Sequence, residues 1–573
     1  SPPATPRSQP PPQPPPQPPN PDALLRDPIH LSAEFELCAG CGHLSRDQAG
    51  RIRAAGFTSV EQYVTWRSVE RAGEGRWDFS AWDAQVEVLR EAGLKWVPFL
   101  IAGPAYSLPD WYRESRDFLG LRCLEHHLDS GVQSGWDPGF RVQVDRFLTA
   151  FAERYRDTGV LESVLLGISG DFGETIFPVW HGNWPTQETG LYHSHGGFWC
   201  GDPEARKDFR AAMEARYGTI GALNEAWGTA CRDFREIRMP SLSLDPVEEF
   251  RIDEYTPPGS FTPRSRAERV RWVDFVDWYR GSMTRYADRW LETACRLFPD
   301  QRVDLCTGGD AEAHHGSDFA DQCRAAARRG GGIRITNEAS DYAQNFVLTR
   351  WVASAGLLRK AAFSFEPAGR VTPDGVTRRV FNAASSGATG LHFYESNVLG
   401  DPKRLASFRK ALPHLRRGSP DIRVGLVYPD VPLLVGDLSM QAFQHHAGLL
   451  RDGLDFVFLD DLAIRDGALS TVQAVLLCTG TWYRQATLSA LLRFLEGGGC
   501  LAAYNVQALR ALETDESWTD RLLAPAGGER SIGRGMSLSL PVRVAIEPED
   551  PELISGTRRP ACRMDPPVEA WQA

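Results

Sequence analysis

Short apolar runs alternate with longer amphipathic segments along most of this chain. Eight runs rich in β-branched and aromatic residues are separated by stretches with apolar residues three and four positions apart. This alternation is typical of repeated βα units around a parallel sheet, and eight strands close a (β/α)8 barrel. The pattern therefore predicts a TIM-type barrel over residues 28–415. Its expected strands are Ile29–Phe35, Ser59–Thr65, Lys95–Ile101, Ser163–Ser169, Arg302–Thr307, Ile333–Thr336, Ala361–Phe365 and Gly390–Tyr394.

The connection between the fourth and fifth strands is much longer than the others. It covers residues 175–300 and contains helical patterns of its own, such as Asp208–Tyr217. We expect an insertion above the barrel mouth, which is where barrel enzymes build their substrate pockets.

A second, shorter α/β pattern begins after residue 420. Its expected strands are Val424–Tyr428, Asp455–Leu459, Ala474–Cys478 and Gly499–Tyr504. We interpret residues 421–515 as a small doubly wound, flavodoxin-like domain, without the GxGxxG turn of a dinucleotide site. Residues 516–573 are rich in Gly and Pro, and their alternating residues indicate a C-terminal segment with β character.

Composition and charge exclude some partners. No apolar run approaches the roughly 20 residues that cross a bilayer, so we expect no membrane span. The net charge is −11 and no basic stripe is present, which argues against nucleic acid. Residues 1–27 form a Pro-rich segment that cannot bury a core and predict a disordered tether. Such a tether suits an exported or envelope-anchored enzyme, but no signal core is present and a cytoplasmic location stays open.

The eleven cysteines do not predict a disulfide framework, because they are scattered and odd in number. Cys38-Ala39-Gly40-Cys41, followed by His43, lacks a second cysteine pair at zinc-ribbon spacing. We interpret it as a small-residue loop that leaves the first strand. Neither a metal nor a cofactor is expected.

Acidic and aromatic residues follow the predicted strands, at the end of the barrel where reactive groups lie. Glu174 follows the fourth strand and Glu366 the seventh, so the two carboxyls are expected to flank a sugar and cleave its glycosidic bond. Glu174 is the candidate acid, because Phe172, Phe177 and the charge of Asp171 would raise its pKa. Glu366, held by the following proline, is the candidate nucleophile. A carboxyl gap of about 5–5.5 Å gives retention, and one of about 6.5–9.5 Å gives inversion.

Aromatic residues and histidines crowd the insertion after Glu174. Sugar rings pack on aromatic planes and need polar partners for their hydroxyls, so this mixture suits carbohydrate. His193 and His195 would also suit a metal, but the spacing offers no third ligand, and hydroxyl binding is the preferred interpretation. The candidates for substrate binding are Asp171, Trp66, Trp180, His181, Trp184, His193, His195, Trp199, Asn337, Glu338, Tyr394 and Glu395.

Three segments resemble glycoside hydrolase family 42 β-galactosidases. They are Val69–Ser80 with Trp82-Asp83, then Glu91–Lys95, and Tyr217-Gly218 through Leu223–Thr229. The resemblance implies an acid/base glutamate after the fourth strand and a nucleophile after the seventh, which correspond to Glu174 and Glu366. The domain after residue 420 is similar to the trimerisation domain of that family and to class I glutamine amidotransferases. A homo-oligomer, trimer or dimer, is therefore expected.

The chain departs from that family directly before the acid. Family 42 has an asparagine there, whereas Gly173 precedes Glu174 here and resembles the acid segment of family 14 β-amylases, which invert. The preferred prediction is a retaining exo-β-glycosidase acting on a galactoside-like sugar. The alternatives are an inverting β-amylase-like glycosidase and a barrel that binds carbohydrate without catalysis. An amidotransferase activity at Cys478 is disfavoured, because its setting lacks the flanking glycine turn.

Overall fold

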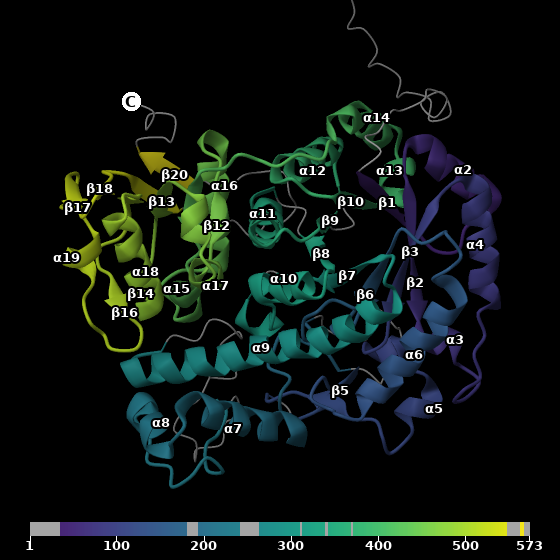
Figure 1. The fold of residues 1–573 in the computed structure, drawn as a ribbon, viewed down its shortest axis with the longest axis horizontal. Helices are drawn as coiled ribbons and strands as arrows, with labels where there is room; N and C mark the ends of the chain where they lie inside the picture. Colours follow the sequence, from purple (N-terminus) through teal and green to yellow (C-terminus); the bar gives the residue numbers. More distant parts are fainter. Residues whose placement is uncertain are drawn as a thin grey trace, which may run out of the picture.

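Eight parallel strands close a barrel in the computed structural model, which describes residues 35–125, 127–179, 193–240, 263–309, 312–338, 342–367, 371–546 and 562–565. The spatial order is β1-β10-β9-β8-β7-β6-β3-β2, and β1 closes the ring by pairing Glu36 with Gly390 of β10. The predicted (β/α)8 barrel is confirmed (Figure 1). Its strands are β1 (Glu36–Gly40), β2 (Ser59–Thr65), β3 (Lys95–Ile101), β6 (Ser163–Gly167), β7 (Arg302–Thr307), β8 (Gly332–Glu338), β9 (Phe363–Pro367) and β10 (Gly390–Tyr394).

The first strand begins later than the sequence pattern predicted. Residues 29–34 lie outside the described part of the chain, and β1 comprises Glu36–Gly40, which includes Cys38, Ala39 and Gly40 of the segment interpreted as a loop. Its small residues have a packing reason. A Cβ on Gly40 would lie 2.4 Å from Nε2 of His392 on β10, so only glycine fits beside that ring. The β-branched pattern, which favours strands rich in Val, Ile and aromatic residues, therefore did not indicate Glu36–Gly40.

Helices cover the outside of the barrel, and their ends carry recognisable caps. Ser45 and Gln48 form a capping box at the start of α2, and Gly56 ends that helix in the left-handed conformation. The helices of this part are α2 (Arg46–Ala55), α3 (Trp66–Val69), α4 (Ser80–Ala92), α5 (Asp110–Arg113), α6 (Phe140–Tyr155), α10 (Phe319–Arg328), α11 (Tyr342–Arg359), α12 (Pro373–Ser386), α13 (Glu395–Leu399) and α14 (Pro402–Ala411), with 3-10 turns at Ala105–Ser107, Ala313–His315 and Leu412–His414.

In its described residues, 193–240 and 263–300, the long fourth connection holds two shorter helices and one long one. After β6 the chain forms α7 (Pro203–Tyr217), α8 (Ile220–Trp227) and the 32-residue α9 (Arg266–Leu297). Figure 1 shows α9 running beneath the barrel toward the second domain, with α7 and α8 below it. A small hairpin of β4 (Gly120–Arg122) and β5 (Asp129–Gln133) precedes α6.

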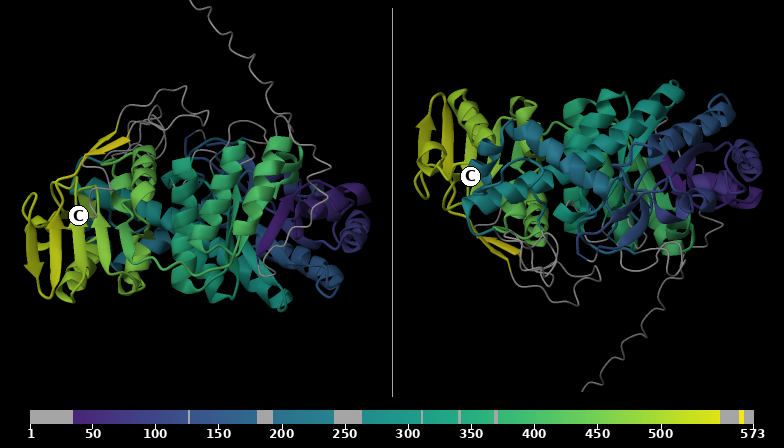
Figure 2. Two further views of the ribbon diagram at one scale, coloured as in Figure 1. Left: turned by 90° about the horizontal axis from the view of Figure 1, so that it is seen from above. Right: turned by 90° about the horizontal axis from the view of Figure 1, so that it is seen from below.

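The second domain contains a sheet of order β12-β11-β13-β15-β18-β17, in which all neighbours are parallel except β17 and β18. The first five strands of this series have the 2-1-3-4-5 order of the predicted flavodoxin-like sheet, but the fifth, β18, lies in the C-terminal segment 516–573 and not within 421–515. Figure 2 shows this sheet beside the barrel in two further views. Its elements are β11 (Val424–Val427), α15 (Asp430–Leu434), α16 (Met440–Gly453), β12 (Val457–Leu459), α17 (Asp461–Arg465), a 3-10 turn (Ala468–Thr471), β13 (Ala474–Leu477), β14 (Trp482–Tyr483), α18 (Gln485–Glu496), β15 (Cys500–Ala503), β16 (Arg510–Ala511), α19 (Thr519–Leu522), β17 (Glu529–Ile532), β18 (Gly535–Ser539), β19 (Arg543–Ile546) and β20 (Cys562–Asp565).

Helix α9 fastens the two domains together. The indole N–H of Trp272 donates to the carbonyl oxygen of Leu434 at 2.8 Å, and the guanidinium of Arg269 lies 3.5 Å from the ring centre of Trp482. Both partners belong to the second domain, whereas α9 leads directly into barrel strand β7. Within the described part of the chain, no helix is both long enough and apolar enough to cross a membrane.

Candidate active site

Glu366 is the penultimate residue of strand β9 and pairs with Thr336 of β8. Its carboxyl is 1% exposed, and Oε1 accepts a hydrogen bond of 2.8 Å from the Tyr394 hydroxyl. Burial raises the pKa of Glu366, while Arg334 and the Tyr394 hydrogen bond act in the opposite direction. Among the described residues, Oε2 has no hydrogen-bond partner. Glu366 is therefore a carboxyl with one oxygen held and one available.

Glu174 lies in a tight loop after β6. The loop closes on itself, because Ile168 N donates to Gly173 O at 2.9 Å and Phe172 N donates to Glu174 Oε2 at 3.2 Å. Gly173 has φ of 126° and packs against β3, where a Cβ would lie 2.8 Å from Cζ of Phe99. The glycine that precedes the predicted acid is thus required by backbone conformation and by packing.

The two carboxyls enter the same end of the barrel interior. Cys306 of β7 is fully buried, and its thiol pKa is raised by burial and then by the charges of Glu174 and Glu366. Glycine also makes room here, since a Cβ on Gly308 would lie 2.8 Å from Cγ of Glu174. The predicted placement of an acidic pair from the fourth and seventh strands is compatible with this arrangement.

Asp171 and Ser194 connect the acid loop to the insertion. Asp171 is 1% exposed, Oδ1 accepts from Ser194 Oγ and Oδ2 from Val179 N, both at 2.7 Å. These contacts suggest that Asp171 positions the loop that carries Glu174. Its contact with a sugar stays a prediction.

Other predicted binding residues have varied settings. Trp66 and Trp199 are fully buried, with indole N–H groups bound to Glu70 Oε2 at 2.6 Å and to Pro178 O at 2.8 Å. Both indole rings are covered by protein, and their contact with a sugar stays a prediction. Glu395 begins α13 directly after β10. Trp180, His181 and Trp184 lie outside the described residues, and the structure gives only the backbone of Asn337 and Glu338, which belong to β8.

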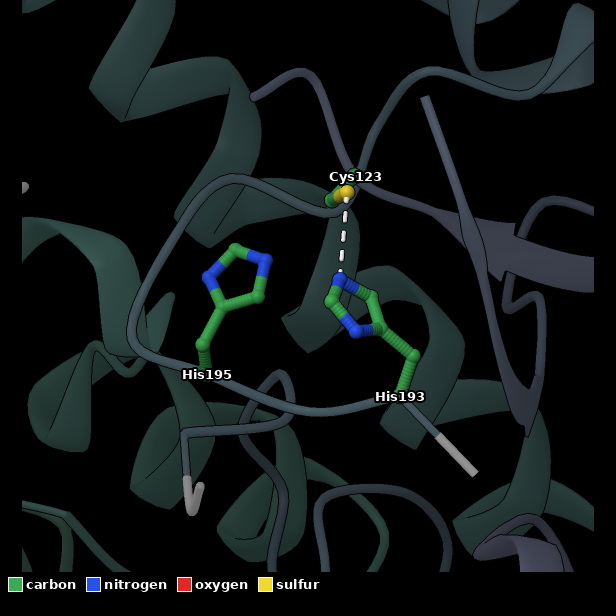
Figure 3. A group of neighbouring side chains, drawn as sticks. All are labelled: Cys123, His193 and His195. Atoms are coloured by element: carbon green, nitrogen blue, oxygen red, sulfur yellow. Dashed lines mark hydrogen bonds between the residues drawn. The ribbon is translucent and has the colours of Figure 1, made fainter. Parts of the chain in front are cut away.

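His193 and His195 lie beside a cysteine that the sequence spacing did not reveal. Figure 3 shows the ring of His193 aimed at Cys123, with Nε2 3.8 Å from Sγ, and His195 on the other side. One ligand atom from each of the three residues lies within 4.8 Å of the others. Thiolate and imidazole are zinc ligands, so these residues could hold such an ion. Cys123 precedes His193 by 70 positions, which is why the third group was missed.

A charged cluster behind Glu366 was also missed. Arg334 of β8 forms ion pairs with Glu61 of β2 and, at 3.2 Å, with Glu36 of β1. Nε2 of His392 on β10 lies 3.7 Å from Glu61 Oε1. All four side chains are buried. The sequence does contain an indication of this cluster, because Glu61 in β2 and Arg334 in β8 are charged residues among apolar or neutral neighbours.

Cys478, the candidate amidotransferase residue, follows β13 and is 1% exposed. Burial raises its thiol pKa to about 12. A thiol in this state is protonated at neutral pH and is a poor nucleophile. The structure gives no support for catalysis at this residue.

The fold and one family match define the class of the protein. Residues 128–305 match the sequence model of Glycosyl hydrolase family 14, and this segment includes Glu174. Together with the closed barrel of eight parallel strands, the match places the chain among the clan A TIM-barrel glycoside hydrolases.

Individual relatives come from two groups within this class. A thermophilic β-amylase of Thermoanaerobacterium thermosulfurigenes is 26% identical over 253 residues, which are 42% of each chain. β-Galactosidase BgaA of Thermus sp. is 31% identical over 230 residues, 37% of this chain and 30% of the relative. The chain thus spans less than half the length of these curated relatives.

A solved structure extends the fold comparison to both domains. The β-galactosidase of the Antarctic haloarchaeon Halorubrum lacusprofundi superposes with a TM-score of 0.62 at 16% identity. The match covers 86% of this chain and 77% of that one. At this identity it establishes a shared fold.

Proposed function

We propose that the protein hydrolyses terminal glycosidic bonds with retention, using Glu174 as acid/base and Glu366 as nucleophile. The observation that carries the proposal is the pair of buried glutamates at one end of the barrel, from the loop after β6 and from β9. A β-galactoside-like sugar is the preferred substrate, because β-galactosidases share the fold of both domains. The paired carboxyls and the buried, water-poor setting are the requirements of this chemistry.

The reaction would proceed in two displacements. In the first, a Glu366 oxygen attacks the anomeric carbon, the bond to the leaving oxygen breaks, and Glu174 gives its proton to that oxygen. In the second, Glu174 removes a proton from water, the water oxygen attacks the anomeric carbon, and the Glu366 carboxylate leaves. The Tyr394 hydroxyl stabilises the charge of Glu366 before attack and after release.

Replacement of the two glutamates tests the assignment. We expect Glu366→Gln to lower kcat/KM by roughly 10³-fold or more, because the attacking oxygen is lost. Glu174→Gln should lose activity on sugars with poor leaving groups and keep much more on aryl glycosides whose leaving group needs no proton. Glu162→Gln is a matched control, because Glu162 precedes β6 at the opposite end of the strand.

Two outcomes would contradict the proposal. Unchanged hydrolysis in both variants would remove the glutamates from the mechanism. Binding of aryl glycosides without any hydrolysis by the unmodified protein would favour a carbohydrate-binding barrel.

An inverting, β-amylase-like hydrolysis is the second candidate. The observation in its favour is the family 14 match across the acid loop, which includes the Gly173-Glu174 pair. NMR of the first product separates the candidates, since retention and inversion release opposite anomers from the same substrate.

A further inference from the structure

The barrel interior behind Glu366 has more negative than positive groups. Two guanidiniums lie there, and both are engaged by other carboxyls. Arg302 binds Asp304 at 2.8 Å and also pairs with Glu36. Arg334 pairs with Glu61 and Glu36, and its Nε donates to Ser364 Oγ at 3.1 Å. Three carboxyls, of Asp304, Glu36 and Glu61, thus pair with the two guanidiniums, and Glu366 adds a fourth carboxyl.

Glu366 is the carboxyl without a guanidinium of its own. Within the described part of the chain it forms no ion pair, and its one hydrogen bond comes from the neutral hydroxyl of Tyr394. Arg334 acts on it from the adjacent strand β8, but Glu61 holds that guanidinium in direct contact. Glu61 therefore weakens the attraction by which the Arg334 guanidinium would keep Glu366 charged.

Glu61 also approaches Glu366 itself. One carboxylate oxygen of Glu61, one of Glu366 and one ring nitrogen of His392 lie within 4.8 Å of one another, and all three residues are at most 1% exposed. Glu61 Oε1, Glu366 Oε2 and both ring nitrogens of His392 have no hydrogen-bond partner among the described residues. Two carboxyls this close in a buried site resist simultaneous ionisation, and of the two Glu61 is the one that contacts Arg334 directly.

The other groups around Glu366 do not cancel this effect. Burial and Arg334 hold the pKa of His392 well below its usual value, so the ring is neutral. Burial likewise raises the pKa of the Tyr63 hydroxyl and the Cys306 thiol, which stay protonated. The titratable or charged groups that face Glu366 are Glu61 and Tyr63 of β2, Glu174 of the loop after β6, Cys306 of β7, Arg334 of β8, and His392 and Tyr394 of β10.

We propose that Glu61 is a positioning residue that sets the proton affinity of Glu366, by placing a second carboxyl beside it and by holding Arg334. Glu61 thereby fixes the pH below which Glu366 is protonated and cannot attack. This inference rests on the proposed role of Glu366 as nucleophile. The effect of Glu61 on the pKa of Glu366 can nevertheless be measured without any substrate.

The first measurement uses the unmodified full-length protein. Carbon-13 NMR of protein labelled at the glutamate side-chain carboxyl follows each titration, and the Glu366 signal is the one that disappears in Glu366→Gln. We expect this signal to titrate above the usual glutamate value of about 4.3, in two steps that reflect ionisation of both carboxyls. A single step at or below about 4.3 would overturn the proposal.

The second measurement uses Glu61→Gln, which keeps the shape and one acceptor while removing the charge. We expect the pKa of Glu366 to fall by about one unit or more, because a repelling charge is lost and Arg334 gains freedom to act. Glu61→Asp restores the charge and should return the titration toward that of the unmodified protein. Glu70→Gln is the matched control. Glu70 is also buried and paired with an arginine, Arg146, but it directly follows helix α3 and does not belong to a barrel strand.

The readouts separate the two proposals. An unshifted Glu366 titration in Glu61→Gln, or an equal shift in Glu70→Gln, would overturn the role of Glu61. If the titration shifts and Glu366→Gln still hydrolyses glycosides at the normal rate, the effect of Glu61 on the pKa of Glu366 stands and the catalytic assignment fails. If both proposals hold, the acidic limit of kcat/KM moves to lower pH in Glu61→Gln by the same amount as the titration.

Discussion

At the scale of single residues, the chemistry depends on glycines as much as on glutamates. Gly173 and Gly308 have no side chain where a Cβ would meet Phe99 or Glu174 at 2.8 Å. They allow the acid loop to approach β3 and β7 closely. The position of the Glu174 carboxyl is therefore set by backbone packing.

Gly173→Ala should destabilise the protein by about 1–3 kcal/mol and lower activity, because it combines a left-handed φ with a clash against Phe99. Denaturant unfolding and kcat/KM would measure the two effects. Gly218→Ala is the matched control, since Gly218 has φ of 71° and nothing within 4 Å of an added Cβ. Equal losses of activity in both variants would contradict the packing argument.

Sequence reasoning found Glu174 and Glu366 because reactive groups in a barrel follow the strands, and a strand end can be predicted from an apolar run. It missed Glu61 and His392 because they lie inside strands and face the interior. It missed Cys123 because its distance from His193 in the chain gives no sign of their proximity in space. Contacts between distant segments were the information that the sequence lacked.

At the scale of elements, strands β2, β3, β7 and β10 have the bounds that their apolar, β-branched runs predicted. The predicted first strand, Ile29–Phe35, lies almost entirely outside the described residues, and β1 comprises Glu36–Gly40. The apolar pattern did not indicate this strand, whose last residue, Gly40, lies against the His392 ring.

Helix α10 begins with a cap that should be sensitive to pH. Asp318 accepts from Asp321 N, and burial, with the charges of Asp321 and Asp460, raises its pKa to about 8. The folded state therefore binds a proton more tightly than the unfolded state. Stability from this proton is complete below the unfolded pKa of about 3.9 and is lost as pH rises through about 8.

Asp318→Asn keeps the cap and removes the titration, so we expect the variant to gain about 1 kcal/mol or more relative to the unmodified protein between pH 5 and 8.5. Thermal unfolding across this range would measure the difference. Asp401→Asn is the matched control, because Asp401 caps the ten-residue α14 but has a lowered pKa. That variant should lose stability at neutral pH, and a similar gain in both would contradict the argument.

At the scale of the whole molecule, a charged cavity of about 560 Å³ separates part of the barrel from the second domain. Arg484 spans it, with contacts to Asp277 of α9 at 2.8 and 3.0 Å and to Asp461 of α17 at 2.9 Å. Burial is the main reason that the pKa of Asp461 is raised to about 6, and the Arg484 charge opposes it. The two domains are thus joined by a buried ion network as well as by apolar contacts.

Arg484→Ala should destabilise the protein by about 3 kcal/mol, since it leaves two partly buried carboxylates without their partner. Denaturant unfolding followed by tryptophan fluorescence would measure the loss. Arg235→Ala is the matched control, because its ion pair with Asp233 is exposed. A loss below about 1 kcal/mol, comparable to an exposed pair, would show that the network contributes little.

The predicted trimer or dimer is a separate expectation for the whole molecule, and light scattering of the full-length chain tests it. The second domain would provide the contact surface, as the resemblance to trimerisation domains implies.

Helix α9 links the second domain to the barrel as one continuous helix, and we expect it to act as a rigid connection. Its 32 residues extend about 48 Å, with one end fixed in the second domain by Trp272 and the other joined to β7. Gly308, just beyond β7, touches Glu174. A tilt of the second domain, such as one imposed by a neighbouring subunit, would therefore be transmitted along a stiff rod to the acid loop. Hydrogen exchange in residues 302–308, compared between Arg484→Ala and the unmodified protein, would report that transmission.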